Sequence, residues 1–135
     1  MKKTSRVQFD FVLDRLEPLS PLVRPMFGCH AVYLGEKMVL ITRKKETERH
    51  DNGVWIATAV EHHASLKKIF PSMRPIRLFG TKPSAWQNIP EDADDFEESV
   101  LTACELILKN DPRIGKIPVR KKRPAGGKKN TLRKR

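Results

Sequence analysis

Hydrophobic residues near the start of the chain follow the spacing of an amphipathic helix. Between residues 5 and 16 they recur at i, i+3, i+4 and i+7, which places them on one face. Thr4 or Ser5 can cap the first turn, and Pro18 and Pro21 end the helix. The pattern therefore predicts a helix over residues 5–16 whose buried face is formed by Phe9, Val12, Leu13 and Leu16.

Three apolar segments in the first half of the chain have the composition of β-strands: residues 26–34, 37–43 and 53–60. Gly35 lies between the first two and suits a tight turn, so we expect them to form a hairpin. The run MVLIT is apolar on both faces, which predicts a central strand covered by helices on at least one side. The charged connection that ends at Asn52-Gly53 predicts an exposed loop, because this pair suits positive φ.

Helical and extended patterns alternate again in the second half of the chain. Residues 61–70 predict a short helix, and residues 76–80 predict a strand that begins late or lies at an edge, because Pro75 precedes it. The sequence AWQNIP is a candidate fifth strand. Residues 92–109 have a helical apolar stripe, with acids at the start and Lys109 at the end to complement the helix dipole.

Together these elements predict an α+β fold in two layers. We expect an antiparallel sheet of four to five strands with about three helices, and the first and last helices should pack on the sheet. A chain of 135 residues is the size of one domain. No apolar run approaches the roughly 20 residues that span a bilayer, and the start of the chain lacks the apolar core of a signal peptide. We therefore expect a cytoplasmic protein without a membrane partner.

The net charge of +11 is concentrated at the C-terminus. Residues 119–135 contain nine Lys and Arg and no acid, whereas residues 1–118 contain 18 Lys and Arg against 16 Asp and Glu. The tail has too few apolar residues to offset its ordering entropy. We therefore expect an α+β domain over residues 1–118 and a disordered basic tail over residues 119–135, with its cations at Arg120, Lys121, Lys122, Arg123, Lys128, Lys129, Arg133, Lys134 and Arg135.

This density of cations predicts attraction to DNA or RNA that weakens with salt. The segment KKRPAGGKK lacks the Arg-Gly-Arg-Pro core of a minor-groove hook, so base selectivity does not follow. A solubilising tail is one alternative interpretation. A nuclear import signal at RKKRP is another.

Gly28, Cys29 and His30 form a group of potential chemical interest inside an apolar segment. Neighbouring residues of a strand point to opposite faces, so we do not expect Cys29 and His30 to share a metal or a proton. No neighbour that stabilises a thiolate is identifiable in the sequence, and we interpret Gly28 as the site of a bulge or of close backbone packing. Cys29 and Cys104 lie far apart in apolar surroundings, which predicts two buried thiols and no disulfide.

The other candidate groups favour structural roles. His62 and His63 are adjacent and cannot form an i, i+4 metal clamp, and no CxxC or HxxxH spacing occurs. The acidic segment EDADD lacks the spacing and the glycine of a calcium loop, and a helix N-terminus explains it. We therefore expect no metal, no cofactor and no catalytic residue. Trp55 and Trp86 are expected in the core, with a surface contact at Trp86 as the alternative.

Two blocks, RPMFGCHAVYLGEKMVLI and WQNIPEDADDFEESVLTACELIL, occur in this order some forty residues apart. Together they resemble the N-terminal domain of the TfoX/Sxy family, which is associated with the regulation of competence in bacteria. The likeness covers roughly residues 8–110 and implies a small α+β fold with helices on one side of an antiparallel sheet. The matching positions, for which the resemblance implies a structural role, are Arg24, Met26, Phe27, Gly28, Tyr33, Met38, Trp86, Pro90, Glu91 and Asp92.

The sequence departs from the family at three points. Cys29 stands where the family commonly has glycine, and the loop RKKETERHDN is longer and more charged than expected. Full-length competence regulators carry a C-terminal helical domain, whereas here we expect only the basic tail to follow. The resemblance therefore implies a fold and supplies no catalytic residues.

The main hypothesis is a non-enzymatic regulatory or interaction module that contacts nucleic acid through its tail and an unknown protein partner through its domain. The alternative is a small enzyme or ligand-binding domain with a cleft near Arg24, Cys29 and His30. A stand-alone domain related to the YjbR-like proteins is a third interpretation.

Overall fold

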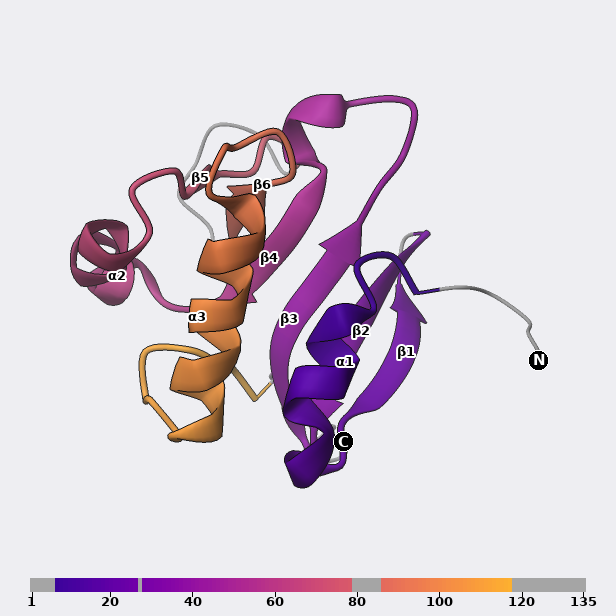
Figure 1. The fold of residues 1–135 in the computed structure, drawn as a ribbon, viewed down its shortest axis with the longest axis vertical. Helices are drawn as coiled ribbons and strands as arrows, with labels where there is room; N and C mark the ends of the chain where they lie inside the picture. The colour runs from indigo at the N-terminus through magenta and orange to yellow at the C-terminus, as the bar shows by residue number, and fades with distance from the viewer. Residues whose placement is uncertain (1–6, 27, 79–85, 118–135) are drawn as a thin grey trace, which may run out of the picture.

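The computed structural model describes residues 7–26, 28–78 and 86–117, which form an antiparallel sheet with helices packed against it (Figure 1). The six strands are ordered β1-β2-β3-β4-β6-β5, and every neighbouring pair is antiparallel. The predicted α+β class is confirmed, with one strand more than expected. The strands are β1 (Leu22–Met26), β2 (Cys29–Leu34), β3 (Lys37–Arg43), β4 (Gly53–Ala57), β5 (Arg74–Pro75) and β6 (Trp86–Pro90).

The α-helices are α1 (Phe11–Leu16), α2 (His63–Ile69) and α3 (Phe96–Leu108). Figure 1 shows α1 and α3 lying next to each other across one face of the sheet, and the rings of Phe9 and Phe96 meet edge to face with centroids 5.0 Å apart. The expectation that the first and last helices pack on the sheet is therefore confirmed. Three short 3-10 segments occur at Glu17–Leu19, Arg49–Asp51 and Val60–His62.

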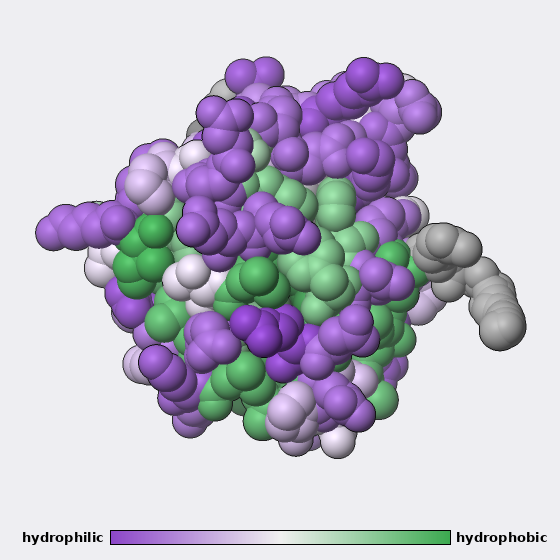
Figure 2. Space-filling view, viewed as in Figure 1, coloured by the Kyte–Doolittle hydropathy of each residue, from purple (hydrophilic) through white to green (hydrophobic). Residues whose placement is uncertain are grey.

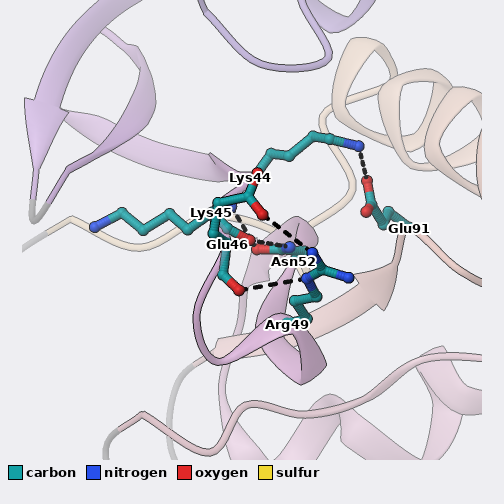
Figure 3. A pocket seen from close by; sticks show the side chains of 6 residues that line it. All are labelled: Lys44, Lys45, Glu46, Arg49, Asn52 and Glu91. Carbon is teal, nitrogen blue, oxygen red and sulfur yellow. Dashed lines mark hydrogen bonds and ion pairs between the residues drawn. The ribbon is translucent and has the colours of Figure 1, made fainter.

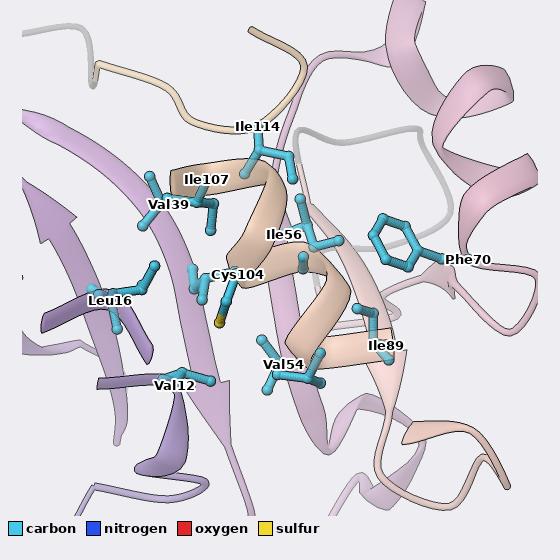
Figure 4. Packing of buried hydrophobic residues seen from close by; sticks show 14 of the residues in the cluster. Val12, Leu16, Val39, Val54, Ile56, Phe70, Ile89, Cys104, Ile107 and Ile114 are labelled. Atoms are coloured by element: carbon cyan, nitrogen blue, oxygen red, sulfur yellow. The ribbon is translucent and has the colours of Figure 1, made fainter. Parts of the chain in front are cut away.

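The main core lies between the helices and the sheet (Figure 4). On β4, Val54 and Ile56 point toward the helices and Trp55 points to the opposite face, as the period of a strand requires. The helices meet them with residues spaced three or four apart, because these positions share one helix face. This core cluster consists of Val12, Leu16, Val32, Val39, Leu40, Val54, Ile56, Leu66, Phe70, Met73, Ile89, Val100, Ala103, Cys104, Ile107 and Ile114.

The single strand predicted over residues 26–34 is wrong. Met26 pairs with Cys29, so the chain reverses between these two residues and a separate strand, β1, precedes β2. Gly28 has φ of 76°, a left-handed conformation that suits a tight turn, so it is not the predicted bulge. The register shift between β2 and β3 falls at Val32/Tyr33 instead.

The strand predicted over residues 76–80 is also wrong for residues 76–78, and residues 79–80 lie outside the described part of the chain. The backbone N–H groups of Arg77 and Leu78 donate to the carboxylate of Asp51, at 2.8 to 3.0 Å. A side chain thus takes the donors that a sheet ladder would need. The candidate fifth strand is confirmed as β6, which lies between β4 and β5.

The helices begin later than predicted, and β4 ends at Ala57, three residues early. Residues 8–10 form a turn before α1, with Phe9 at φ of 55°, and the predicted caps Thr4 and Ser5 lie outside the described residues. The acidic residues 92–95 form turns before α3, which starts at Phe96. The apolar stripes located the helices, but turn geometry decided their first residues.

Two contacts hold the first and last described segments against the sheet. Near the start, His30 Nδ1 lies 2.9 Å from the side-chain oxygen of Gln8. Near the end, Lys116 and Met38 exchange backbone hydrogen bonds of 2.8 and 2.9 Å, which form an isolated antiparallel bridge beside the start of β3.

The segment between α3 and Lys116 is held by an ion pair. Arg113 donates from its side chain and its backbone N–H to the Asp111 carboxylate, with contacts of 2.7 to 3.0 Å. The Arg113 side chain lowers the pKa of Asp111 to about 2. This pair therefore persists at neutral pH and directs the chain toward Met38.

We expect Gly53→Ala to destabilise the protein by about 2 kcal/mol or more. Gly53 has φ of 145°, and a Cβ there would collide with the backbone carbonyl oxygen of Ile89, which cannot yield without breaking the β4–β6 pairing. Gly35→Ala is the matched control. Gly35 also has positive φ, but a Cβ there meets nothing within 4 Å, so we expect this variant to lose only about 1 kcal/mol of unfolding free energy. Urea denaturation of both variants measures the difference, and equal costs would contradict the collision.

Candidate functional site

A second hydrophobic cluster covers the face of the sheet that points away from α1 and α3. None of its members among the described residues comes from a helix. We call this the second face, and its buried members are Cys29, Ala31, Met38, Ile41, Trp55 and Ile76, with Met26, Tyr33 and Trp86 partly buried around them. Trp55 is buried, as the core interpretation expected, whereas Trp86 is partly buried with its ring centroid 6.0 Å from that of Trp55.

The structure brings five of the ten motif residues to the second face: Arg24, Met26, Tyr33, Met38 and Trp86. Met26, Tyr33 and Trp86 pack against its cluster, and the Arg24 guanidinium lies 5.4 Å from the centroid of the Tyr33 ring. Gly28 forms the adjacent turn, while Phe27 lies outside the described residues. Pro90 is set apart from this group, because it is buried at the end of β6 opposite Gly53.

Cys29 and His30 lie on opposite faces of the sheet, as predicted. Cys29 belongs to the second face and is 4% exposed, whereas the His30 ring contacts Gln8 at the start of the chain. Arg24 shares the face of Cys29, because its partner on β2 is Ala31. The cleft expected near Arg24, Cys29 and His30 is therefore divided by the sheet itself.

Two cations beside Cys29 were not predicted from the sequence. Arg43 is 3% exposed and hydrogen-bonds the Cys29 thiol, and Lys45 lies close enough to affect the same group electrostatically. Burial nevertheless dominates and raises the pKa of the Cys29 thiol, while Lys45 and Arg43 oppose this rise. The thiol is therefore protonated at neutral pH. The only signal in the sequence was that Arg43 follows Ile41 by two positions, which places both on one face.

Arg43 is held mainly by oxygen atoms of the loop that follows it. Its Nη1 donates to Asn52 Oδ1 and to the carbonyl of Glu48, each at 2.8 Å, and its Nη2 donates to the carbonyl of Thr47 at 3.1 Å. Asn52 also accepts from the Lys45 N–H and donates to the Lys45 carbonyl. These bonds close the β3–β4 connection into a compact loop.

The same loop bounds a hollow of about 270 Å³ at the end of the sheet (Figure 3). Two of its cations already pair with acids across it: Lys44 with Glu91 at 2.8 Å and Arg49 with Glu46 at 3.0 Å. Figure 2 shows hydrophilic surface gathered over this end of the molecule. Because its charges largely neutralise one another, the hollow has little net attraction for an anion. Its lining residues are Lys44, Lys45, Glu46, Arg49, Asn52 and Glu91.

No group of His, Cys, Asp or Glu within residues 7–26, 28–78 and 86–117 is arranged to hold a metal ion. His62 ends the 3-10 segment before α2, and His63 is the first residue of α2. Burial lowers the pKa of His63, with His62 adding to this effect. The acidic residues before α3 contact their neighbours, Asp95 accepting from the Ser72 hydroxyl at 3.0 Å. Within the described residues, no helix is long and apolar enough to cross a membrane.

The nine cations predicted to bind nucleic acid lie outside the described residues: Arg120, Lys121, Lys122, Arg123, Lys128, Lys129, Arg133, Lys134 and Arg135. Comparisons with protein-family models, curated proteins and solved structures find no match to this chain. A function must therefore be inferred from the geometry of the domain and from the charge distribution of the chain.

We expect both cysteines to react slowly with iodoacetamide in the folded protein at pH 7. Burial raises the pKa of Cys104 to about 12 and also raises that of Cys29, so the nucleophilic thiolate is scarce at both positions. Mass spectrometry of the alkylated chain measures the rates, with the urea-unfolded chain as the control in which both thiols react. Rapid labelling of Cys29 at pH 7 would contradict the prediction and favour a ligand-binding or enzymatic role.

We expect Asp51→Ala to release the segment that follows β5. The buried Asp51 carboxylate accepts the N–H groups of Arg77 and Leu78, and its removal should cost about 2 kcal/mol. Urea denaturation measures this cost, and amide hydrogen exchange should become faster at Arg77 and Leu78. The exposed Asp10→Ala is the control, and unchanged exchange at both amides would contradict this role of Asp51.

Proposed function

We propose that the protein is a non-enzymatic regulatory or interaction module of the TfoX N-terminal-domain kind, acting in the cytoplasm. Its basic tail contacts the phosphates of DNA or RNA, while its domain surface recognises a protein partner. The proposal rests on the sequence resemblance and on the strong division of charge between domain and tail.

The proposed contact with nucleic acid rests on the difference in charge between the described domain and the tail. The described residues contain fourteen Lys and Arg against sixteen Asp and Glu, whereas residues 119–135 contain nine cations and no acid. Five of these fourteen cations also lie in ion pairs, for example Lys44 with Glu91 and Arg113 with Asp111. Long-range attraction to a polyanion must therefore come from the ends of the chain.

The alternative is a small enzyme or ligand-binding domain that uses Arg24, Cys29 and His30. The proximity of Arg43 and Lys45 to the Cys29 thiol is the observation in its favour. Two observations weigh against it: His30 lies across the sheet, and burial holds the thiol protonated. The regulatory module is therefore the better supported function.

We expect the full chain to bind a duplex DNA or RNA with an affinity that falls steeply with salt. If five or six phosphates are engaged on duplex DNA, log K falls with log salt at a slope of about −5. Fluorescence anisotropy of a labelled duplex across a salt series measures this slope.

Two variants test whether the tail supplies the binding. One chain ends at residue 118, and the other is full length with the nine tail cations replaced by Gln, which keeps the length of the tail. Both should lose most of the affinity, and far-UV circular dichroism should show that the domain is still folded. Undiminished binding by the Gln variant would overturn the tail as the contact, and failure of the unaltered chain to bind at low salt would overturn the nucleic-acid role.

A further inference from the structure

The described domain carries opposite charges at the two ends of α3. Residues 91–98, which lead into and begin this helix, contain six acids and no Lys or Arg, whereas residues 109–117 contain three cations and one acid. Four of the six acids form no ion pair within the described residues. Figure 1 shows the two segments at opposite ends of α3, with residues 109–117 beside the start of β3. A polyanion near the domain is therefore repelled by one end of α3 and attracted by the other.

Three lysines gather at the basic end. The side chain of Lys37, at the start of β3, runs over Gly115, because a Cβ at this glycine would lie 2.7 Å from Lys37 Cδ. Its ammonium donates to the side-chain oxygen of Asn110 at 3.3 Å. Gly115 directly precedes Lys116, and Asn110 directly follows Lys109. The Lys37 side chain thus reaches from the backbone beside one lysine to the backbone beside the other. We call Lys37, Lys109 and Lys116 the lysine patch.

The acids around the lysine patch compete little for its charges. None of the three lysines forms an ion pair within the described residues, and two of them are exposed while Lys37 is partly buried. The Asp111 carboxylate is bound by Arg113 at 2.7 Å. Glu36, in the exposed turn before β3, offsets one of the three charges. The patch therefore keeps a net positive charge.

We propose that the lysine patch contacts the phosphate backbone of DNA or RNA and so sets which side of the domain faces the nucleic acid. This inference rests on the proposed function and adds the surface of the domain itself that touches the polyanion. The described residues have no net positive charge, so the patch supplies short-range contacts and not the long-range attraction. Contacts between lysines and phosphates position a protein without reading the base sequence, so the patch should bind without base preference.

Two full-length variants with the same change in net charge test the lysine patch. The patch variant replaces its three lysines by Gln. The control variant removes three exposed cations elsewhere on the domain: Lys44→Gln, Arg49→Gln and Lys68→Gln. Far-UV circular dichroism should show that both variants are folded.

Fluorescence anisotropy with a labelled DNA duplex measures the effect on binding. The patch variant should bind at least about fivefold more weakly than the unaltered chain, whereas the control variant should stay within about twofold. The slope of log K against log salt should become shallower by about 2 to 3 in the patch variant, because each lost phosphate contact contributes about 0.9. Equal losses in the two variants, or no loss in either, would overturn the patch and leave the tail contact intact. An unaltered chain that binds no duplex at low salt would overturn both proposals.

Lysine footprinting on the unaltered chain provides a second measurement that needs no substitution. The full chain is acetylated with acetic anhydride in the presence and absence of saturating duplex, and mass spectrometry measures the labelling of each lysine. Lys109 and Lys116 should be protected by the duplex, while the exposed Lys68 on α2 should react equally in both samples. Labelling of Lys109 and Lys116 that the bound duplex leaves unchanged would overturn the patch.

Discussion

The hydrogen bonds of the Asn52 side-chain amide hold one end of the sheet together. The amide joins the buried Arg43 guanidinium to both backbone groups of Lys45, and thereby closes the connection between β3 and β4. Its neighbours extend the same constraint: the Asp51 carboxylate holds the segment after β5, and Gly53 lies against the backbone of β6. Three consecutive residues thus join the end of β3, the segment after β5 and strand β6.

Those features of the fold that depend on local periodicity could be predicted from the sequence. The apolar stripes located all three α-helices, and the run at residues 38–42 identified β3 as an interior strand. The errors arose where distant contacts decide the local structure. Residues 76–78 have an apolar pattern that favours a strand, but the Asp51 carboxylate captures their donors. The turn at Gly28 was missed because apolar residues continue on both sides of it.

For the candidate site, too, the features that depend on local periodicity could be predicted, and those that depend on distant contacts could not. The separation of Cys29 from His30 followed from the alternation of side chains along a strand, and the structure agrees. The approach of Arg43 and Lys45 to the thiol could not be predicted, because it depends on how the β3–β4 connection folds back. The grouping of Arg24 with Tyr33 required knowing that β1 is a separate strand, since pairing with β2 places these two residues on one face.

The two edge strands of the sheet are poorly suited to pairing with a strand of another molecule. One edge is β1, whose Pro25 has no N–H to offer a further strand and whose Arg24 places a charge beside it. The other edge is β5, which is only two residues long and also contains a proline, Pro75. The long apolar strands β3 and β4 are enclosed between these poor templates. These edge strands therefore disfavour edge-to-edge pairing of native molecules through the described sheet.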